Sequence, residues 1–111
     1  MNILFICSMN RWRSPTAEQI YKNHSRINVR SAGTSRKAKR TISYSDIKWA
    51  DVICVMESKH RSKLKADFRD LMNHKKIYVL DIEDNYKYMD LELIELLSQT
   101  IDPIIESSTG L

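Results

Sequence analysis

The chain has 111 residues, 42% of them hydrophobic, and carries a formal net charge of +4. This length and apolar content fit one compact domain, residues 1–111, that can bury a core without a disulfide or a metal. The two glycines, Gly33 and Gly110, stand far apart, which excludes glycine-rich nucleotide-binding loops. The two cysteines and three histidines show no metal-ligand spacing, so neither a metal nor another cofactor is expected.

The amino terminus predicts neither a secretory signal nor a membrane anchor. Its apolar run ends at Cys7 and has no basic segment before it. No other run approaches the ~20 apolar residues that a membrane span needs. Unpaired cysteines suit a reducing compartment. We therefore expect a monomeric, cytoplasmic protein.

The charge is distributed unevenly along the chain. Residues 1–45 carry nine Lys or Arg and one acid, Glu18, whereas residues 46–111 carry nine Lys or Arg and thirteen Asp or Glu. A basic first half predicts a site for phosphate or another anion. Within it, the basic segment 35–40 is interpreted as a solvated loop, and steering of phosphorylated protein or nucleic acid is the alternative.

Apolar runs alternate with helix signals. Runs at 3–7, 27–30, 52–56 and 77–80 predict strands, the first and third continuous enough to be buried on both faces of a parallel sheet. The first helix is expected to start with Ser14 as N-cap and Pro15 as first helical residue. A turn is predicted at 31–34, and further helices at 43–50 and 57–68. This alternation predicts a three-layer αβα fold around a four-stranded parallel sheet.

The last helix is predicted to follow an Asp90 cap. Its expected apolar face consists of Leu91, Ile94, Leu97 and Ile101. A kink or new cap is expected at Pro103, and residues 107–111 are expected to fray.

Functional loops of a parallel sheet lie at the carboxyl ends of its strands. Cys7, Gly33, the segment around Glu57 and the segment 81–88 are all predicted to lie there. Cys7 and Arg13 form a C-x5-R pattern at the junction of the first strand with the first helix. Helix-start N–H groups favour a thiolate there and can bind phosphate oxygens, which a guanidinium can grip bidentately. The alternative, an inert core thiol and a solvated arginine, explains neither the Ser-Pro helix start nor the basic first half.

Four segments, in order, resemble the low-molecular-weight protein tyrosine phosphatases. The first is ILFICSMNRWRSPTAE at 3–18, which is highly specific. The others are SAGT at 31–34, DVICVMESKH at 51–60 and DIEDNY at 81–86, so the resemblance spans most of the chain.

The resemblance implies a metal-independent phosphomonoester hydrolase, above all a protein tyrosine phosphatase acting on phosphotyrosine in proteins. Cys7 would attack phosphorus to form a cysteinyl-phosphate, and Arg13 with the loop N–H groups would hold the phosphate oxygens. Asp84 would serve as general acid and then base, with Asp81 as the alternative. The other implied substrate-binding residues are Ser8, Met9, Asn10, Arg11, Trp12, Ser14, Tyr86 and Tyr88. Among them, Asn10 would shape the loop, Ser14 would stabilise the thiolate, and the tyrosines would stack on an aryl phosphate.

The sequence also departs from the family pattern. Met9 stands where glycine is common, Trp12 where a second cysteine is frequent, and Asn85 where proline usually follows the acid. The segment between Thr34 and Asp51 is short, which predicts a reduced or absent helix and a more open cleft.

Two other functions remain as alternatives. An arsenate reductase shares this fold and loop, but it needs relay cysteines, and Cys54 in a predicted strand is interpreted as core. A non-catalytic phosphate- or RNA-binding module could use the basic half. His60 and Arg61 are interpreted as a solvated helix start, with a role near the cleft as the alternative.

Overall fold

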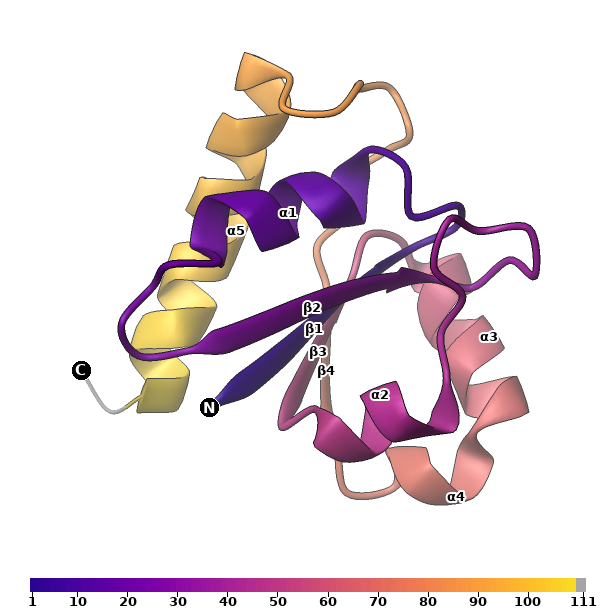
Figure 1. The fold of residues 1–111 in the computed structure, drawn as a ribbon. Coiled ribbons are helices and arrows are strands. Elements are labelled where there is room, and N and C mark those ends of the chain that lie inside the picture. Colours follow the sequence, from indigo (N-terminus) through magenta and orange to yellow (C-terminus); the bar gives the residue numbers. More distant parts are fainter. Residues whose placement is uncertain (110–111) are drawn as a thin grey trace.

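The computed structural model, which describes residues 1–109, has a four-stranded parallel sheet at its centre (Figure 1). Its strands are β1 (Asn2–Cys7), β2 (Asn28–Gly33), β3 (Val52–Val55) and β4 (Lys76–Val79), in the order β2-β1-β3-β4. Because β2 is added on one side of β1 and β3 on the other, the topological switch point lies between β1 and β3. The four predicted strands and their parallel arrangement are confirmed.

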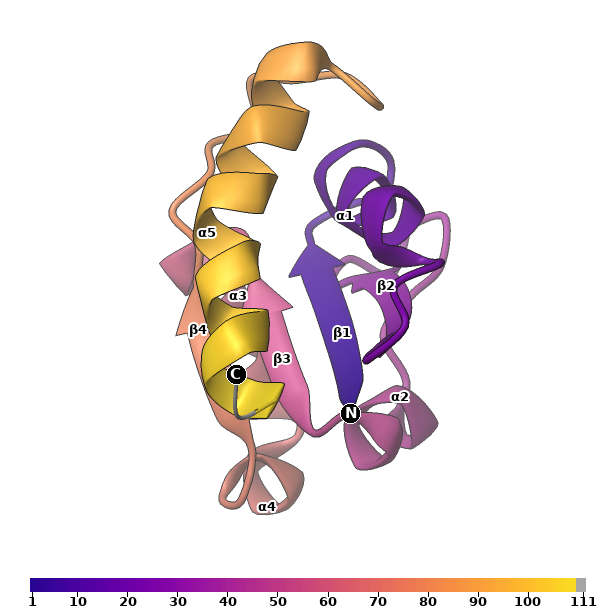
Figure 2. The same ribbon diagram turned by 90° about the vertical axis from the view of Figure 1, so that its left-hand side faces the viewer.

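Helices cover both faces of the sheet. α1 (Arg13–Tyr21) and α5 (Leu91–Thr109) lie on one face, and Figure 2 shows α5 in front of β3 and β4 with α1 beside it. α2 (Tyr44–Trp49), α3 (Ser58–Asp67) and α4 (Arg69–Met72) lie on the other. Strand residues alternate between two buried clusters, with Ile3 and Phe5 facing α1 and α5, and Leu4 and Ile6 facing α2 to α4. The predicted three-layer fold is confirmed.

The prediction for the start of α1 is wrong. The helix begins at Arg13, Trp12 is its N-cap residue without a side-chain cap, and Ser14 lies inside the first turn. The Ser14 hydroxyl does not cap the helix because it contacts the thiol of Cys7 instead. The short loop between β1 and α1 therefore comprises residues 8–12.

The end of β2 also differs from the prediction. Ser31, Ala32 and Gly33 were expected in a turn, yet they continue the strand, and Gly33 pairs with Cys7. The strand continues because the end of β1 supplies parallel partners for these residues.

The apolar face of α5 is shifted from the predicted one. Asp90 does cap the helix, accepting a hydrogen bond from the N–H of Glu92 at 2.9 Å. The buried side chains are Leu93, Leu97, Ile101 and Ile105, whereas Leu91 is 84% exposed and Ile94 half-buried. Leu97 and Ile101 belong to both the predicted and the observed apolar face. The observed face repeats every four residues, so it also contains Leu93 and Ile105.

α5 continues through Pro103 to Thr109, so no new cap forms at Pro103, and residues 107–109 are helical although fraying was expected. Proline has no backbone N–H, so the helix lacks one hydrogen bond at Pro103. Burial of Ile105 in the turn after the proline offsets this loss. Residues 110–111, including Gly110, lie outside the described residues.

The predicted helices at 43–50 and 57–68 correspond to α2 and α3, and the one-turn helix α4 was not foreseen. The helix expected to be reduced or absent is present as the six-residue α2. Within residues 1–109, no helix combines the length and the apolar character that crossing a bilayer requires.

Candidate active site

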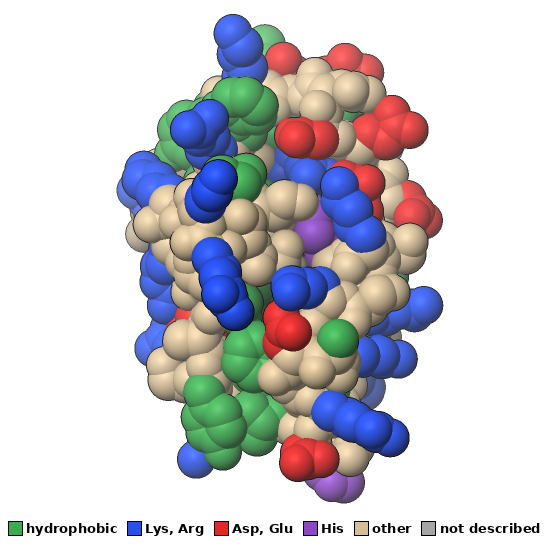
Figure 3. All heavy atoms as spheres, turned by 90° about the vertical axis from the view of Figure 1, so that its right-hand side faces the viewer, with side chains coloured by type: hydrophobic (Ala, Val, Ile, Leu, Met, Phe, Trp, Pro, Cys, Tyr) green, Lys and Arg blue, Asp and Glu red, His purple; other side chains and the backbone are tan. Residues whose placement is uncertain are grey.

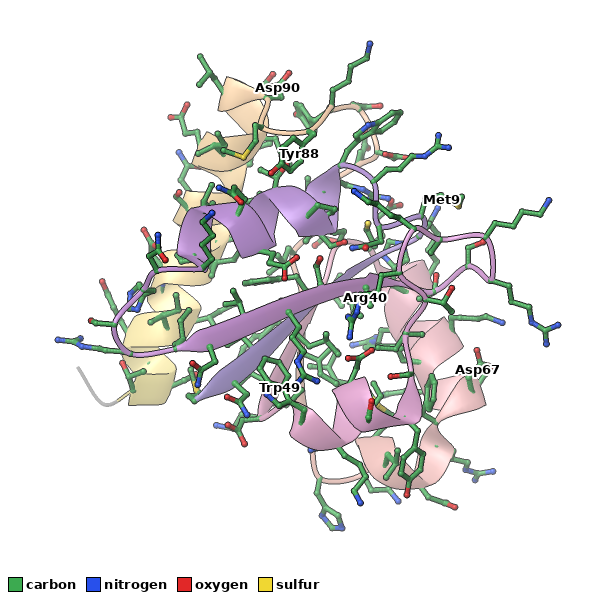
Figure 4. The ribbon with its side chains drawn as sticks, in the orientation of Figure 1. Met9, Arg40, Trp49, Asp67, Tyr88 and Asp90 are labelled. Carbon is green, nitrogen blue, oxygen red and sulfur yellow. The ribbon has the colours of Figure 1, made fainter. Side chains whose placement is uncertain are left out.

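A cavity of about 210 Å³ lies over the loop that joins β1 to α1. Figure 4 shows Met9 on this loop, at the carboxyl edge of the sheet. The cavity is lined by Cys7, Met9, Arg11, Trp12, Arg13 and Asp84. Five of these six come from one short segment, and the sixth comes from the segment that follows β4. The sheet's switch point therefore brings the predicted nucleophile, clamp and acid to one place.

A hydrogen-bond chain orients the thiol of Cys7. Its sulfur lies 2.9 Å from the Ser14 hydroxyl oxygen. Asn10 donates from its side-chain amide to that oxygen at 2.9 Å and to the Ser31 hydroxyl at 3.0 Å. The Ser14 oxygen accepts from Asn10, and its proton has two acceptors in reach, the Cys7 sulfur at 2.9 Å and the Ala32 carbonyl at 3.4 Å. Ser14 is thus placed to donate to a thiolate.

Asn10, not Met9, is the loop residue in the left-handed region. Its φ is 53°, a conformation that asparagine tolerates better than most residues. Met9 is not among the positive-φ residues, so its side chain brings no backbone strain of this kind. The loop can therefore form without the glycine that is common at position 9 in the family.

Gly33, at the end of β2, packs directly against the backbone of the loop between β1 and α1. A Cβ atom at this position would lie 2.4 Å from the carbonyl oxygen of Ser8 and 3.0 Å from the amide nitrogen of Asn10. Both atoms belong to backbone, which cannot move without displacing the loop. A glycine is needed at position 33 because the backbone of the loop 8–12 approaches β2 closely there, whereas the sequence suggested that Gly33 forms a turn.

Arg13 is buried, and its guanidinium is held on one side. Nη1 donates to Glu57 and to the backbone carbonyl of Ile82, the latter at 2.8 Å. Nε and Nη2 make no hydrogen bond with the described residues, and Nε lies 3.6 Å from a carboxylate oxygen of Asp84. The edge that grips two phosphate oxygens is therefore open, with Asp84 beside it.

His60 is buried at 1% exposure, so its interpretation as a solvated helix start is wrong, whereas Arg61 is exposed. Its Nδ1 accepts from the N–H of Glu57 at 3.0 Å, and its Nε2 lies 2.8 Å from the hydroxyl oxygen of Ser8. With Nδ1 as acceptor, the neutral ring carries its proton on Nε2 and donates to Ser8. The start of α3 thus contacts the loop 8–12 through His60 and Ser8, and the start of α1 through Glu57 and Arg13.

Both groups at the start of α3 have shifted pKa values. Burial, with the nearby positive charge of Arg13, lowers the pKa of His60 to about 4. Partial burial acts to raise the pKa of Glu57, but the hydrogen bond from Arg13 and its charge outweigh it and lower this pKa. At neutral pH the site therefore contains a neutral imidazole and an ionised carboxylate.

The other predicted site residues lie at different distances from the cavity. Asp84 lines it, whereas Asp81 is exposed and not part of the lining. Tyr88 lines a neighbouring hollow, and Tyr86 packs against the core cluster beneath α5.

Cys54 lies in the core as predicted. It is fully buried in the middle of β3, and burial raises the pKa of its thiol to about 12. Both cysteines are free. Across residues 1–109, no group of three or more His, Cys, Asp or Glu is arranged to hold a metal ion.

The basic segment 35–40 is only partly a solvated loop. Arg36, Lys37 and Lys39 are exposed, but Arg40 donates to the carbonyl of Ser31 at 2.7 Å and pairs with buried Asp46. Arg40 is held because burial of Asp46 requires a cation nearby, and this ion pair lowers the pKa of that carboxyl against the effect of its burial. Figure 3 shows Asp and Glu gathered at the upper right of this face, whereas Lys and Arg lie along the left flank, across the middle and at the lower right.

Residues 2–48 match the sequence model of the low molecular weight phosphotyrosine protein phosphatases. This segment runs from β1 into α2 and contains the whole phosphate loop. No curated protein sequence matches the chain.

Solved structures of this family share the fold over nearly the whole chain. A low molecular weight protein tyrosine phosphatase from T. tengcongensis is 25% identical, with a TM-score of 0.78 over 96% of this chain and 99% of that one. The YwlE arginine phosphatase from Geobacillus stearothermophilus is 21% identical, with a TM-score of 0.78 over 98% and 93%. The tyrosine phosphatase Wzb from Escherichia coli K30 is 20% identical, with a TM-score of 0.74 over 96% of each chain.

The matched segment and the shared fold place Cys7 in the position of the nucleophile loop of cysteine-dependent phosphatases. The chain is therefore similar to the low molecular weight phosphotyrosine protein phosphatases in sequence over residues 2–48 and in fold over nearly its whole length.

Two residues of the site's surroundings were missed in the sequence. Glu57 was predicted only as a helix start near the carboxyl end of the third strand, without its partner Arg13, and His60 was assigned to solvent. The available signal was their spacing, since an acidic N-cap followed three residues later by a side chain that returns to the cap's N–H forms a capping box.

Proposed function

We propose that this chain hydrolyses phosphotyrosine in proteins through a cysteinyl-phosphate, without a metal. One observation carries the proposal. The sulfur of Cys7, the open edge of the Arg13 guanidinium and the carboxylate of Asp84 meet at one cavity of about 210 Å³.

In the first step, the thiolate of Cys7 attacks phosphorus and the bond to the phenolic oxygen breaks. Arg13 holds two phosphate oxygens through Nε and Nη2, and the N–H groups of loop 8–12 bind the negative charge that spreads over the oxygens. Asp84 gives its proton to the leaving phenolate. Because Asp84 lies beside Nε, its carboxyl group moves away from Arg13 as phosphate enters, and it takes up a proton from water before it acts as the acid.

In the second step, water attacks the phosphorus of the cysteinyl-phosphate. Asp84 takes the proton of this water, the sulfur–phosphorus bond breaks, and phosphate leaves. The departing thiolate is stabilised by the proton that Ser14 donates. Ser8 and Asn10 act on the loop's shape, since the first is held by His60 and the second by Ser14 and Ser31.

The preference for an aryl phosphate is supported by the aromatic surface near the cavity. Trp12 lines the cavity and is 36% exposed, and Tyr88 is exposed nearby. Aromatic rings stack on a tyrosine ring with a gain of about 0.5–1.5 kcal/mol per pair. Since arginine phosphatases share this fold, phosphoarginine is the substrate to compare directly. We also propose action as a monomer in the cytoplasm, where a reducing environment keeps the Cys7 thiol free.

The test is hydrolysis of p-nitrophenyl phosphate and phosphotyrosyl peptide in the presence of a metal chelator. We expect turnover by the wild-type protein and none by the Cys7→Ser variant. Phosphoserine, phosphoarginine and RNA-end phosphates complete the hydrolysis panel, and reduction of arsenate to arsenite with a thiol reductant is measured separately. Activity that survives in Cys7→Ser contradicts the mechanism. Binding without turnover, lost steeply with salt, would favour a phosphate- or RNA-binding module.

A further inference from the structure

A second hollow, of about 370 Å³, lies beside the active-site cavity. Arg11 lines both, so the two hollows adjoin. The second hollow lies along α1, with Lys22 at its far end and Lys39 from the basic loop on its side. Figure 4 shows Tyr88 above α1, where it completes the lining. We name this hollow the α1 groove.

The α1 groove is strongly positive. Arg11, Lys22 and Lys39 are all exposed, and none forms an ion pair or a side-chain hydrogen bond with the residues that the structure describes. The one carboxylate in the lining, Glu18, accepts a hydrogen bond from Ser31 at 2.6 Å. Three cations thus face one carboxylate that is already engaged.

The groove is fixed relative to the phosphate loop. The N–H of Lys39 donates to the carbonyl of Met9 at 2.9 Å, and the N–H of Ser35 donates to the carbonyl of Ser8 at 3.0 Å. These bonds attach the basic loop to the residues that surround Cys7. A charge at Lys39 therefore keeps its place next to the cavity.

We propose that the α1 groove binds a second anionic group of the substrate, a carboxylate or phosphate close in sequence to the phosphorylated residue. The proposal rests on the proposed function, because the first phosphate must occupy the cavity over Cys7. Since Arg11 lines both hollows, one or two residues of extended peptide, roughly 7 Å, span from one to the other. Two lysines and an arginine bind such a group through their charge. They select a substrate with a negative charge near the phosphorylated residue, not one with a particular sequence.

A long polyanion fits this surface less well. Glu83 and Asp84 are exposed in the segment after β4, from which Asp84 lines the cavity over Cys7. They repel an anionic chain that crosses the whole site. The arrangement suits a substrate that carries its second negative charge on one side only.

The test compares three phosphotyrosyl peptides that differ in the flanking residues, which are acidic, neutral or basic on either side. The variant is Lys22→Gln with Lys39→Gln. The matched control, Lys65→Gln with Lys76→Gln, removes the same charge from exposed positions remote from the site. Substrate p-nitrophenyl phosphate, which lacks a second anion, measures the catalytic centre alone. Dissociation constants of the peptides for the Cys7→Ser variant measure binding without turnover.

We expect wild-type kcat/KM for the acidic peptide to exceed that for the neutral one by about threefold to tenfold, and to lose this advantage in high salt. The groove variant should lose the preference while hydrolysing p-nitrophenyl phosphate normally, and the control should keep it. Equal kcat/KM for acidic and neutral peptides, with p-nitrophenyl phosphate turned over, overturns the groove but not the phosphatase. If no substrate turns over, the proposed function fails, and equal peptide affinities for Cys7→Ser then overturn the groove independently.

Discussion

Glu57 holds the guanidinium of Arg13 by Nη1 and leaves its Nε and Nη2 atoms without a hydrogen bond to the described residues. This one-sided contact fixes the plane of the guanidinium before any substrate arrives. An arginine with 2% side-chain exposure and no such partner would pay a large desolvation cost. Glu57 therefore stabilises the buried charge of Arg13 and also orients its guanidinium toward the cavity.

The first prediction concerns this pair. Glu57→Gln keeps the shape of the side chain and removes its charge, so Arg13 is held less firmly. We expect kcat/KM for p-nitrophenyl phosphate to fall roughly tenfold, because a charge-assisted hydrogen bond becomes a neutral one. Glu95→Gln, an exposed acid on α5, is the control and should match the wild type. Equal activity of Glu57→Gln and wild type would show that Glu57 does not position the arginine.

The second prediction concerns Gly33. Gly33→Ala places a Cβ against the backbone of Ser8 and Asn10, so the phosphate loop must shift. We expect a loss of about 1–3 kcal/mol in the free energy of unfolding and a large loss of activity. The added Cβ would also lie 2.6 Å from the Cβ of Ala38, so Ala38→Gly relieves that contact alone. The double variant should therefore not recover activity, and full recovery would place the crowding at Ala38.

The third prediction concerns Ser14. Ser14→Ala removes the donor to the Cys7 sulfur and leaves the amide of Asn10 without one acceptor. We expect kcat to fall roughly tenfold to a hundredfold, as for loss of a hydrogen bond to a charged group. Alkylation of Cys7 by iodoacetamide at neutral pH, measured by mass spectrometry, should slow in parallel. Ser45→Ala, an exposed serine on α2, is the control. Unchanged alkylation would mean that Ser14 does not act on the thiolate.

The fourth prediction separates the two candidate acids. Asp84→Asn should slow hydrolysis of phosphotyrosine much more than that of p-nitrophenyl phosphate, since nitrophenolate leaves readily without a proton. Asp81→Asn should change both rates little, because Asp81 does not line the cavity. The reverse pattern would assign the acid to Asp81.

The fifth prediction concerns pH. The pKa of His60 is lowered by burial to about 4 in the folded protein, against about 6.5 in the unfolded chain. Above pH 6.5 the imidazole is neutral in both states, and its contribution to stability is complete. As the pH falls from about 6.5 to about 4 the unfolded chain binds the proton first, so stability decreases, by roughly 3 kcal/mol in total. Urea unfolding across this range should show the slope in the wild type and a flatter profile in His60→Asn. Identical slopes would show that His60 is not the group responsible.

Much of the fold could be predicted because each level of the sequence agreed with the next. Continuous apolar runs such as 52–55 have only one environment that suits them, a strand covered on both faces. The C-x5-R segment was also placed correctly between a strand and a helix, because the apolar run that ends at Cys7 is a local signal.

The errors lie where a contact in the folded protein overrides the local pattern. Ser14 left its expected capping role for the sulfur of Cys7, and Ser31 to Gly33 stayed in a strand because β1 runs alongside. His60 became buried because Ser8, 52 residues earlier in the chain, supplies its hydrogen-bond partner. Leu91 was assigned to the core on helical spacing alone. Such spacing shows that the helix has an apolar face, but it does not show which residues at the edge of that face are buried.

The central claim is that Cys7 carries the phosphoryl group during turnover. The most direct measurement is acid quenching of the wild-type protein during steady-state hydrolysis of a phosphotyrosyl peptide, followed by mass spectrometry of the peptide that contains Cys7. We predict one phosphoryl group on the sulfur of Cys7. The phosphorylated fraction should be larger in Asp84→Asn with p-nitrophenyl phosphate, because hydrolysis of the intermediate is slowed in that variant. Cys7→Ser should show no phosphorylated Cys7 under the same conditions. Full turnover with no phosphorylated Cys7 at any quench time, in either the wild type or Asp84→Asn, would contradict the account.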